Sequence, residues 1–195
     1  VIDVDNDEVI KHIPYAGEFD NENVRGGERG LRGIAVLEDK IVVADSSGLL
    51  ELDRNTYEIT NQKQDRGFFK SVHEICYFDN HIWVTSTGYD AIVKLDSDFN
   101  IIEFWEILGE SKEDHKIFTG KRQIDPKDSV PDDKYHINSI SAFSDRLVFS
   151  ALITHLYDFD TMEVAEPMPS IDGVKSFQHN FYAYDDCTVI NMTSL

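Results

Sequence analysis

Four polar residues, Arg32, His73, Asn138 and His179, stand at corresponding points of a recurring pattern. They lie 41, 65 and 41 residues apart, and each directly precedes a segment of alternating apolar residues. A fifth, His136, precedes Asn138 by two residues, which in a strand would place both side chains on one side. Imidazoles transfer protons near neutral pH, and a guanidinium binds anions. If the fold gathers these residues, the sequence predicts a ligand-binding site made of all five.

The elements that must position these residues are short strands. Each residue begins a hairpin in which apolar alternation continues on both sides of an acidic turn, over 32–45, 73–86, 138–151 and 179–192. The longest interval contains a polar stretch near 108–132, and removing about 24 residues of insertion restores a period of about 41. That period is the length of a four-stranded propeller blade.

A second hairpin follows each of the first three. Its turn aspartates, Asp53, Asp96 and Asp160, lie 21, 23 and 22 residues after Arg32, His73 and Asn138, respectively. In three repeats, the distance from the polar residue that begins the first hairpin to the aspartate of the second hairpin is therefore nearly constant. The sequence predicts an all-β fold, a β-propeller of four-stranded antiparallel blades, with four blades countable in the chain.

The two ends of the sequence hold complementary half-units. The chain opens with a second hairpin around Asp5 and closes with a first hairpin. We expect one domain over 1–195, composed of a half blade at 1–15, blades at about 30–62, 72–107 and 136–168, and a half blade at 177–195. Two architectures remain open: a four-bladed ring closed by its termini, or the four-blade portion of a larger propeller.

The strands resemble those of NHL, YVTN and SMP-30-type propellers, as the rhythm of residues 82–96 illustrates. The sequence is more similar to an uncharacterised bacterial family of six-bladed propellers, through three motifs: Val72-His73-Glu74, His136-Ile137-Asn138 and Gln178-His179. The resemblance covers about residues 30–195 and implies six blades and the same candidate residues, but no activity. It departs at Gln178, where the family usually has proline.

Charge excludes two classes of partner. The chain has 18 Lys+Arg against 37 Asp+Glu, a formal net charge of −19, which argues against nucleic acid and anionic membranes. No apolar run reaches the ~18–20 residues of a membrane helix, and no secretory signal is visible. The two cysteines, Cys76 and Cys187, make no disulfide framework. These features assign no compartment.

Two long polar segments, 15–31 and 108–135, are expected to be loops that overhang the channel mouth. Both carry basic residues, which with Arg32 would form a rim for a carboxylate, sulfate or phosphate. The rim residues are Arg25, Arg29, Lys112, Lys116, Lys121, Arg122 and Lys127.

Three functions fit a propeller whose inner strands bring these residues to the channel mouth. The first is binding of a small anionic molecule or a protein partner, without a cofactor. The second is a metal-dependent lyase or hydrolase, in which His73, His136 and His179 hold a divalent transition metal or act as acid and base. The third is a structural propeller subunit of an assembly.

Overall fold

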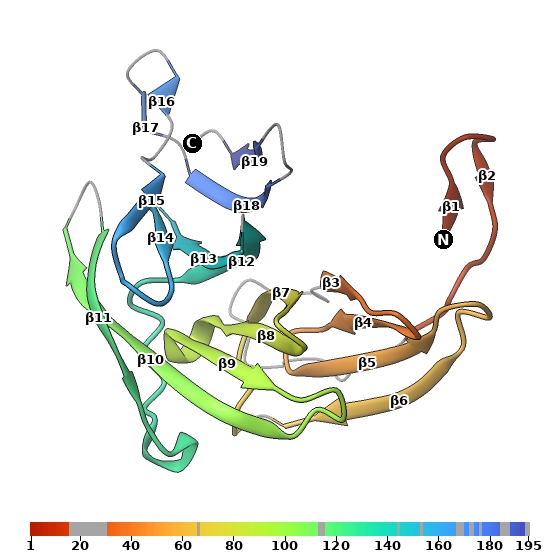
Figure 1. The fold of residues 1–195 in the computed structure, drawn as a ribbon, viewed down its shortest axis with the longest axis horizontal. Helices are drawn as coiled ribbons and strands as arrows, with labels where there is room; N and C mark the ends of the chain where they lie inside the picture. Colours follow the sequence, from red (N-terminus) through yellow and green to blue (C-terminus); the bar gives the residue numbers. More distant parts are fainter. Residues whose placement is uncertain are drawn as a thin grey trace.

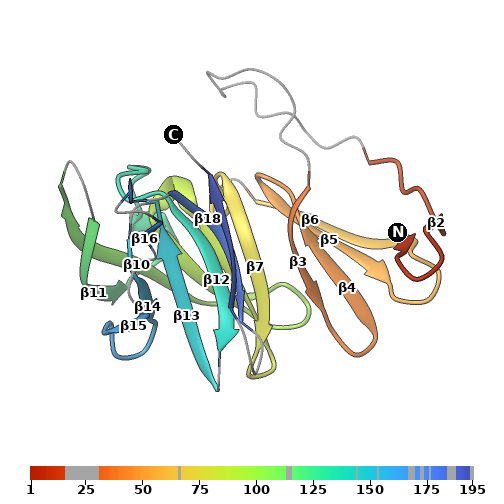
Figure 2. The ribbon, with the colours of Figure 1, turned by 90° about the horizontal axis from the view of Figure 1, so that it is seen from above.

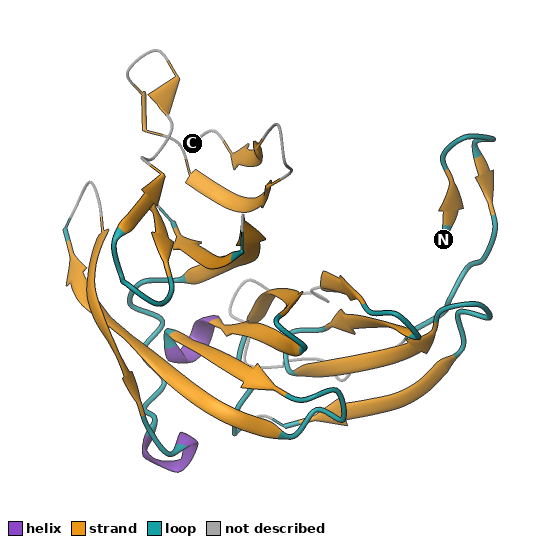
Figure 3. Ribbon diagram, in the orientation of Figure 1, coloured by secondary structure: helices purple, strands orange, loops and turns teal. Residues whose placement is uncertain are grey.

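The polypeptide forms antiparallel sheets arranged around an open ring (Figure 1). The computed structural model describes residues 1–15, 31–65, 67–112, 116–143, 145–152, 154–166, 170–171, 174–175, 177–183 and 188–193, with side chains up to residue 165. Strands dominate these residues, and two short 3₁₀ helices, η1 (Thr87–Tyr89) and η2 (Pro126–Asp128), lie between them (Figure 3). No helix in the described residues is long and apolar enough to span a membrane.

Blades 1 and 3 are four-stranded sheets whose strands pair in chain order. Blade 1 consists of β3 (Arg32–Val36), β4 (Lys40–Ala44), β5 (Gly48–Asp53) and β6 (Ile59–Gln64). Blade 3 consists of β12 (Ile137–Phe143), β13 (Arg146–Ala151), β14 (Leu156–Asp158) and β15 (Val164–Glu166). The fold is therefore the predicted β-propeller architecture of antiparallel blades.

Blade 2 has five strands: β7 (Val72–Phe78), β8 (His81–Ser86), β9 (Ala91–Leu95), β10 (Ile101–Ser111) and β11 (Lys116–Gln123). The expectation of a loop over 108–135 is wrong for its first half, because β10 continues to Ser111 and β11 pairs back along it. Phe118 of β11 is 3% exposed and packs on Phe149 and Tyr157 of blade 3, at ring-centroid distances of 5.2 and 5.0 Å. The extra strand thus covers the side of the next blade.

Because side chains alternate along a strand, each blade has two apolar faces. One face of a blade packs on the preceding blade and the other on the following blade. Ala35, Val42 and Leu49 of blade 1 pack in one buried cluster with residues of blade 2 such as Ile82 and Val93. The opposite face of blade 2 packs on blade 3 in a second cluster. These two inter-blade cores supply most of the buried apolar surface, which is the main stabilising contribution to folding.

The outer hairpin of blade 1 is closed by a capped turn. Asp53 Oδ1 accepts hydrogen bonds from the backbone N–H groups of Asn55 and Thr56, at 2.9 and 2.7 Å. Such bonds satisfy backbone N–H groups in the turn, where the chain reverses and no strand-to-strand hydrogen bonds are available. In blade 2, Asp96 caps the corresponding turn through Asp98 and Asn100.

In the other two turns the capping aspartate lies earlier than the spacing predicts. Asp158 and Asp3 cap six-residue turns at 158–163 and 3–8. The prediction of Asp160 and Asp5 is wrong by two residues in both cases. The three turns at 3–8, 53–58 and 158–163 share one local pattern, in which the capping aspartate comes first and a glutamate follows five positions later.

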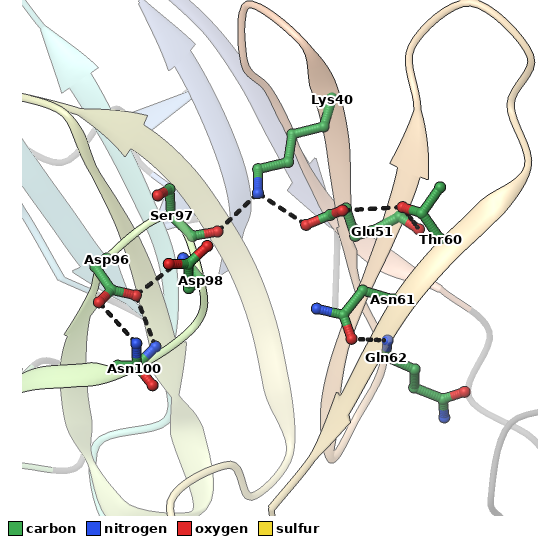
Figure 4. Close-up of polar contacts among 9 residues, drawn as sticks. All are labelled: Lys40, Glu51, Thr60, Asn61, Gln62, Asp96, Ser97, Asp98 and Asn100. Carbon is green, nitrogen blue, oxygen red and sulfur yellow. Dashed lines mark hydrogen bonds and ion pairs between the residues drawn. The ribbon is translucent and has the colours of Figure 1, made fainter.

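Lysines tie these turns to the preceding part of the chain. Lys40 Nζ of blade 1 donates to the Ser97 carbonyl at 2.7 Å and to Glu51 Oε2 at 2.8 Å (Figure 4). Ser97 lies in the turn that Asp96 caps. Lys63 reaches the same turn through the Phe99 carbonyl. The same kind of tether joins Lys11 to the Thr56 carbonyl and Lys121 to the Phe159 carbonyl, in two other turns.

The remaining strands form separate hairpins: β1 (Ile2–Asp3) with β2 (Glu8–Val9), β16 (Ser170–Ile171) with β17 (Val174–Lys175), and β18 (Phe177–Ala183) with β19 (Thr188–Thr193). The first and last of these lie apart (Figures 1 and 2). The half blades do not join into one sheet, so the ring is open in this structure.

Candidate functional site

The pairing register places His73, Asn138 and His179 inside β-bulges and Arg32 directly before one. In β7, Val72 lies opposite Ser86 and Ile75 opposite Val84, so three residue steps on one strand oppose two on the other. A bulge with one extra residue also occurs in β12, β18 and β3, where two residue steps oppose one. Bulges turn side chains away from simple alternation and are frequent beside functional sites.

The innermost strands lie side by side in the order β3, β7, β12, β18 (Figure 1). Gly33 shows how close the first two come. Its φ is +23°, and a Cβ there would lie 2.6 Å from Ile75 N and 2.7 Å from Glu74 Oε1. The bulges of β3 and β7 are therefore in direct contact, which brings the backbone of Arg32 close to that of His73.

His73 and His136 form the central contact of the site. Their ring centroids are 4.8 Å apart with an interplanar angle of 74°, an edge-to-face arrangement. Strand alternation, which predicted His136 on one side with Asn138, does not account for its place beside His73. His136 precedes β12 and has a φ of +59°, in the left-handed region, so it lies outside the regular strand.

Asp133 orients the His136 ring. Its Oδ1 lies 2.8 Å from His136 Nδ1, and the two side chains are 49% and 23% exposed. A carboxylate on one ring nitrogen fixes the orientation of the imidazole and directs the other nitrogen elsewhere. Asp133 is not among the residues predicted from the sequence, although it lies only three residues before His136.

Asp90 holds the segment that carries His136. Its carboxylate accepts hydrogen bonds from three successive backbone N–H groups, those of Lys134, Tyr135 and His136, at 2.6 to 3.0 Å. Asp90 is 4% exposed and follows η1 between β8 and β9. Burial raises the pKa of its carboxyl, and the three N–H groups oppose that shift. A residue of blade 2 therefore positions the blade 3 side of the site.

The structure describes the side chains of only some of the other predicted site residues. Arg32 and His73 are half-buried, and Asn138 is fully buried at its bulge. The backbone of His179 lies in β18, but its side chain is outside the described set, as are Arg25, Arg29 and Cys187. Within the described residues, no three His, Cys, Asp or Glu side chains are grouped to hold a metal ion.

The predicted basic rim on 108–135 is wrong. Burial lowers the pKa values of Lys116 and Lys121, which donate to the carbonyls of Tyr135 and Phe159. Arg122 pairs with Glu106 across β10 and β11, and Lys112 pairs with Glu110 at 3.7 Å. Because these bases lie on the β10–β11 hairpin, they join blade 2 to blade 3 or pair within the hairpin instead of surrounding the channel.

Comparisons with known proteins reveal a likeness of structure. No protein-family model and no curated protein matches the chain. A catalytically inactive variant of virginiamycin B lyase from Staphylococcus aureus, solved with quinupristin, has a TM-score of 0.51 and 13% identity, and the match covers 83% of this chain and 62% of the lyase.

Two other solved structures are similar at lower scores. The designed Ika4 protein has a TM-score of 0.47 with 10% identity over 86% of this chain and 88% of its own. The Pan2 WD40 domain of Neurospora crassa has a TM-score of 0.44 with 15% identity over 77% of this chain and 42% of its own. At 13% identity, the likeness to virginiamycin B lyase shows the fold alone, which is that of a β-propeller.

Proposed function

We propose that the inner ends of the blades bind a small anionic ligand through Arg32, His73, His136, Asn138 and His179. The observation that carries this proposal is the edge-to-face contact of His73 with His136, two imidazoles from successive blades whose rings are 4.8 Å apart. Convergent polar groups on rigid strands are typical of ligand sites. Arg32, directly before the bulge in β3 of the neighbouring blade, adds a permanent positive charge.

The Asp133 contact supports a proton-dependent form of this binding. With Asp133 at Nδ1, His136 presents Nε2, which donates a hydrogen bond only when the ring is protonated. A protonated imidazole carries a positive charge and attracts an anion, so binding should strengthen at lower pH.

Calorimetric titration with inorganic phosphate and with malonate, at pH 6 and pH 8, tests the proposal. We expect binding of at least one of these probes, tighter at pH 6, and at least about tenfold weaker in His136→Ala. The control is His81→Ala, because His81 begins β8 at the opposite end of blade 2. Absence of binding of both probes, or equal effects of the two substitutions, would contradict the site.

A second candidate is acid–base or metal-dependent chemistry of the lyase or hydrolase kind, favoured by the 2.8 Å contact that orients His136 through Asp133. The lyase named above is a neighbour in fold. Elemental analysis of purified protein separates the candidates: a stoichiometric transition metal that is lost in His73→Ala would favour the enzyme. Membership of the six-bladed bacterial family also stays a prediction.

A further inference from the structure

Blade 1 carries a second apolar face that matches a packed face of blade 2. By pairing register, Ile34, Ile41, Val43, Leu50 and Leu52 of blade 1 correspond to a set in blade 2 that is at most 2% exposed: Ile75, Ile82, Val84, Val93 and Leu95. The set in blade 2 is buried because it receives blade 1. Blade 1 therefore presents the face that receives a preceding blade.

The residues that the structure describes cover this face only in part. Ile13 and Tyr15 pack over Val43 and its neighbours on the outer strands, and the Tyr15 hydroxyl donates to Asp45 at 2.7 Å. On the innermost strand, Ile34 and Val36 remain 60% and 54% exposed. An apolar strand surface of this kind is typical of an interface rather than of a solvated edge.

The two terminal hairpins have features of the two halves of a blade. β18–β19 has the inner-hairpin bulge at His179, and β1–β2 has the outer-hairpin turn capped by Asp3. Each hairpin is a sheet of only two strands in the described part of the chain. Both leave strand edges unpaired, and a free edge of this kind tends to pair with another strand.

We infer that a second copy of this chain covers the free face of blade 1. The β18–β19 hairpin of that copy would pack on Ile34 and Val36, and its β19 would pair with β1 to complete a four-stranded composite blade. The reciprocal contact would close a two-fold ring with three blades from each chain and two composite blades. A ring of about eight blades lies within the known range. Because the head-to-tail contact closes the ring, it leaves no blade face uncovered.

The arrangement of the chain favours a second copy over closure by its own hairpin. In this structure β18 lies beside β12, and β1–β2 lies on the other side of the opening (Figures 1 and 2). The apolar face must also overcome repulsion, because each chain has a formal net charge of −19. Salt screens such repulsion, so association should strengthen as the salt concentration rises.

Sedimentation velocity over a dilution series, at low and high NaCl, tests this inference. We expect a particle of twice the 22.3 kDa chain mass that is favoured by salt. Ile34→Asp and Val36→Asp should each weaken the dimer at least about 100-fold, since each would bury an unpaired carboxylate. The control Val130→Asp, at a side chain 73% exposed on the link before blade 3, should not. Far-UV circular dichroism checks that each variant is folded.

Hydrogen exchange identifies the pairing strands. In the dimer, amides of β1 and β19 should be protected in the unchanged chain and exposed in Ile34→Asp. A monomer at all concentrations overturns the inference, and a monomer with protected β1 and β19 shows closure within one chain instead. A dimer that is insensitive to both Asp substitutions uses another surface and also overturns it, as does a larger oligomer.

Discussion

Replacing Asp90 by alanine should loosen the candidate site from a distance. The substitution removes an acceptor for three buried or half-buried N–H groups, those of Lys134, Tyr135 and His136. Each unsatisfied buried donor costs about 1–3 kcal/mol, and the removal of a buried carboxylate offsets part of that cost. We expect the free energy of unfolding to fall by about 3–5 kcal/mol, a large share of the ~5–15 kcal/mol of a typical domain.

Urea denaturation measures this loss, and hydrogen exchange of residues 134–136 locates it. The matched control is Asp125→Ala on the same link, where an exposed carboxylate accepts one bond, from Lys127 N at 3.0 Å. That change should cost about 0.5–2 kcal/mol, as loss of a cap does. Equal losses in Asp90→Ala and Asp125→Ala, or unchanged exchange at 134–136, would refute the assignment of Asp90 as the positioning residue.

Three further outcomes can be measured by denaturation. Phe118→Ala should destabilise by about 3–5 kcal/mol, whereas Leu108→Ala, at a side chain 37% exposed, should cost under about 1 kcal/mol. Gly33→Ala should destabilise by at least about 2 kcal/mol, because its Cβ would meet Ile75 N at 2.6 Å, whereas Gly120→Ala, with nothing within 4 Å, should stabilise slightly. The N–H groups of Thr56 and Asn55 lower the pKa of Asp53, so the stability from its ionised form is lost as the pH falls through that lowered pKa. Asp53→Asn should weaken the pH dependence of unfolding below about pH 4.

The repeating hairpins could be predicted from sequence because their signals are local. Apolar alternation and acidic turns lie within about 14 residues, and they located His73, Asn138 and His179, the residues that lie inside β-bulges. These successes depend on the period of the repeat and need no knowledge of contacts between distant residues.

The parts that sequence reasoning missed depend on long-range contacts or on backbone geometry. Asp90 lies 44 to 46 residues from the N–H groups that it binds, and nothing beside it in the sequence indicates a partner. β11 was taken for a loop because its exposed positions are polar and basic, although Phe118 packs inward. The bulges change which way side chains point without altering the hydrophobic pattern that predicts the strands.

The lysine tethers have a consequence for how such a chain can grow. Every tether from Lys11, Lys40, Lys63 and Lys121 reaches a main-chain carbonyl in the turn that it contacts. Every amino acid has a main-chain carbonyl, so the acceptor of each of these hydrogen bonds is kept when a residue of the turn is substituted. A duplicated or exchanged module would therefore need a lysine in the correct register to make this contact, and the contact would place no demand on the side chains of the turn that receives it.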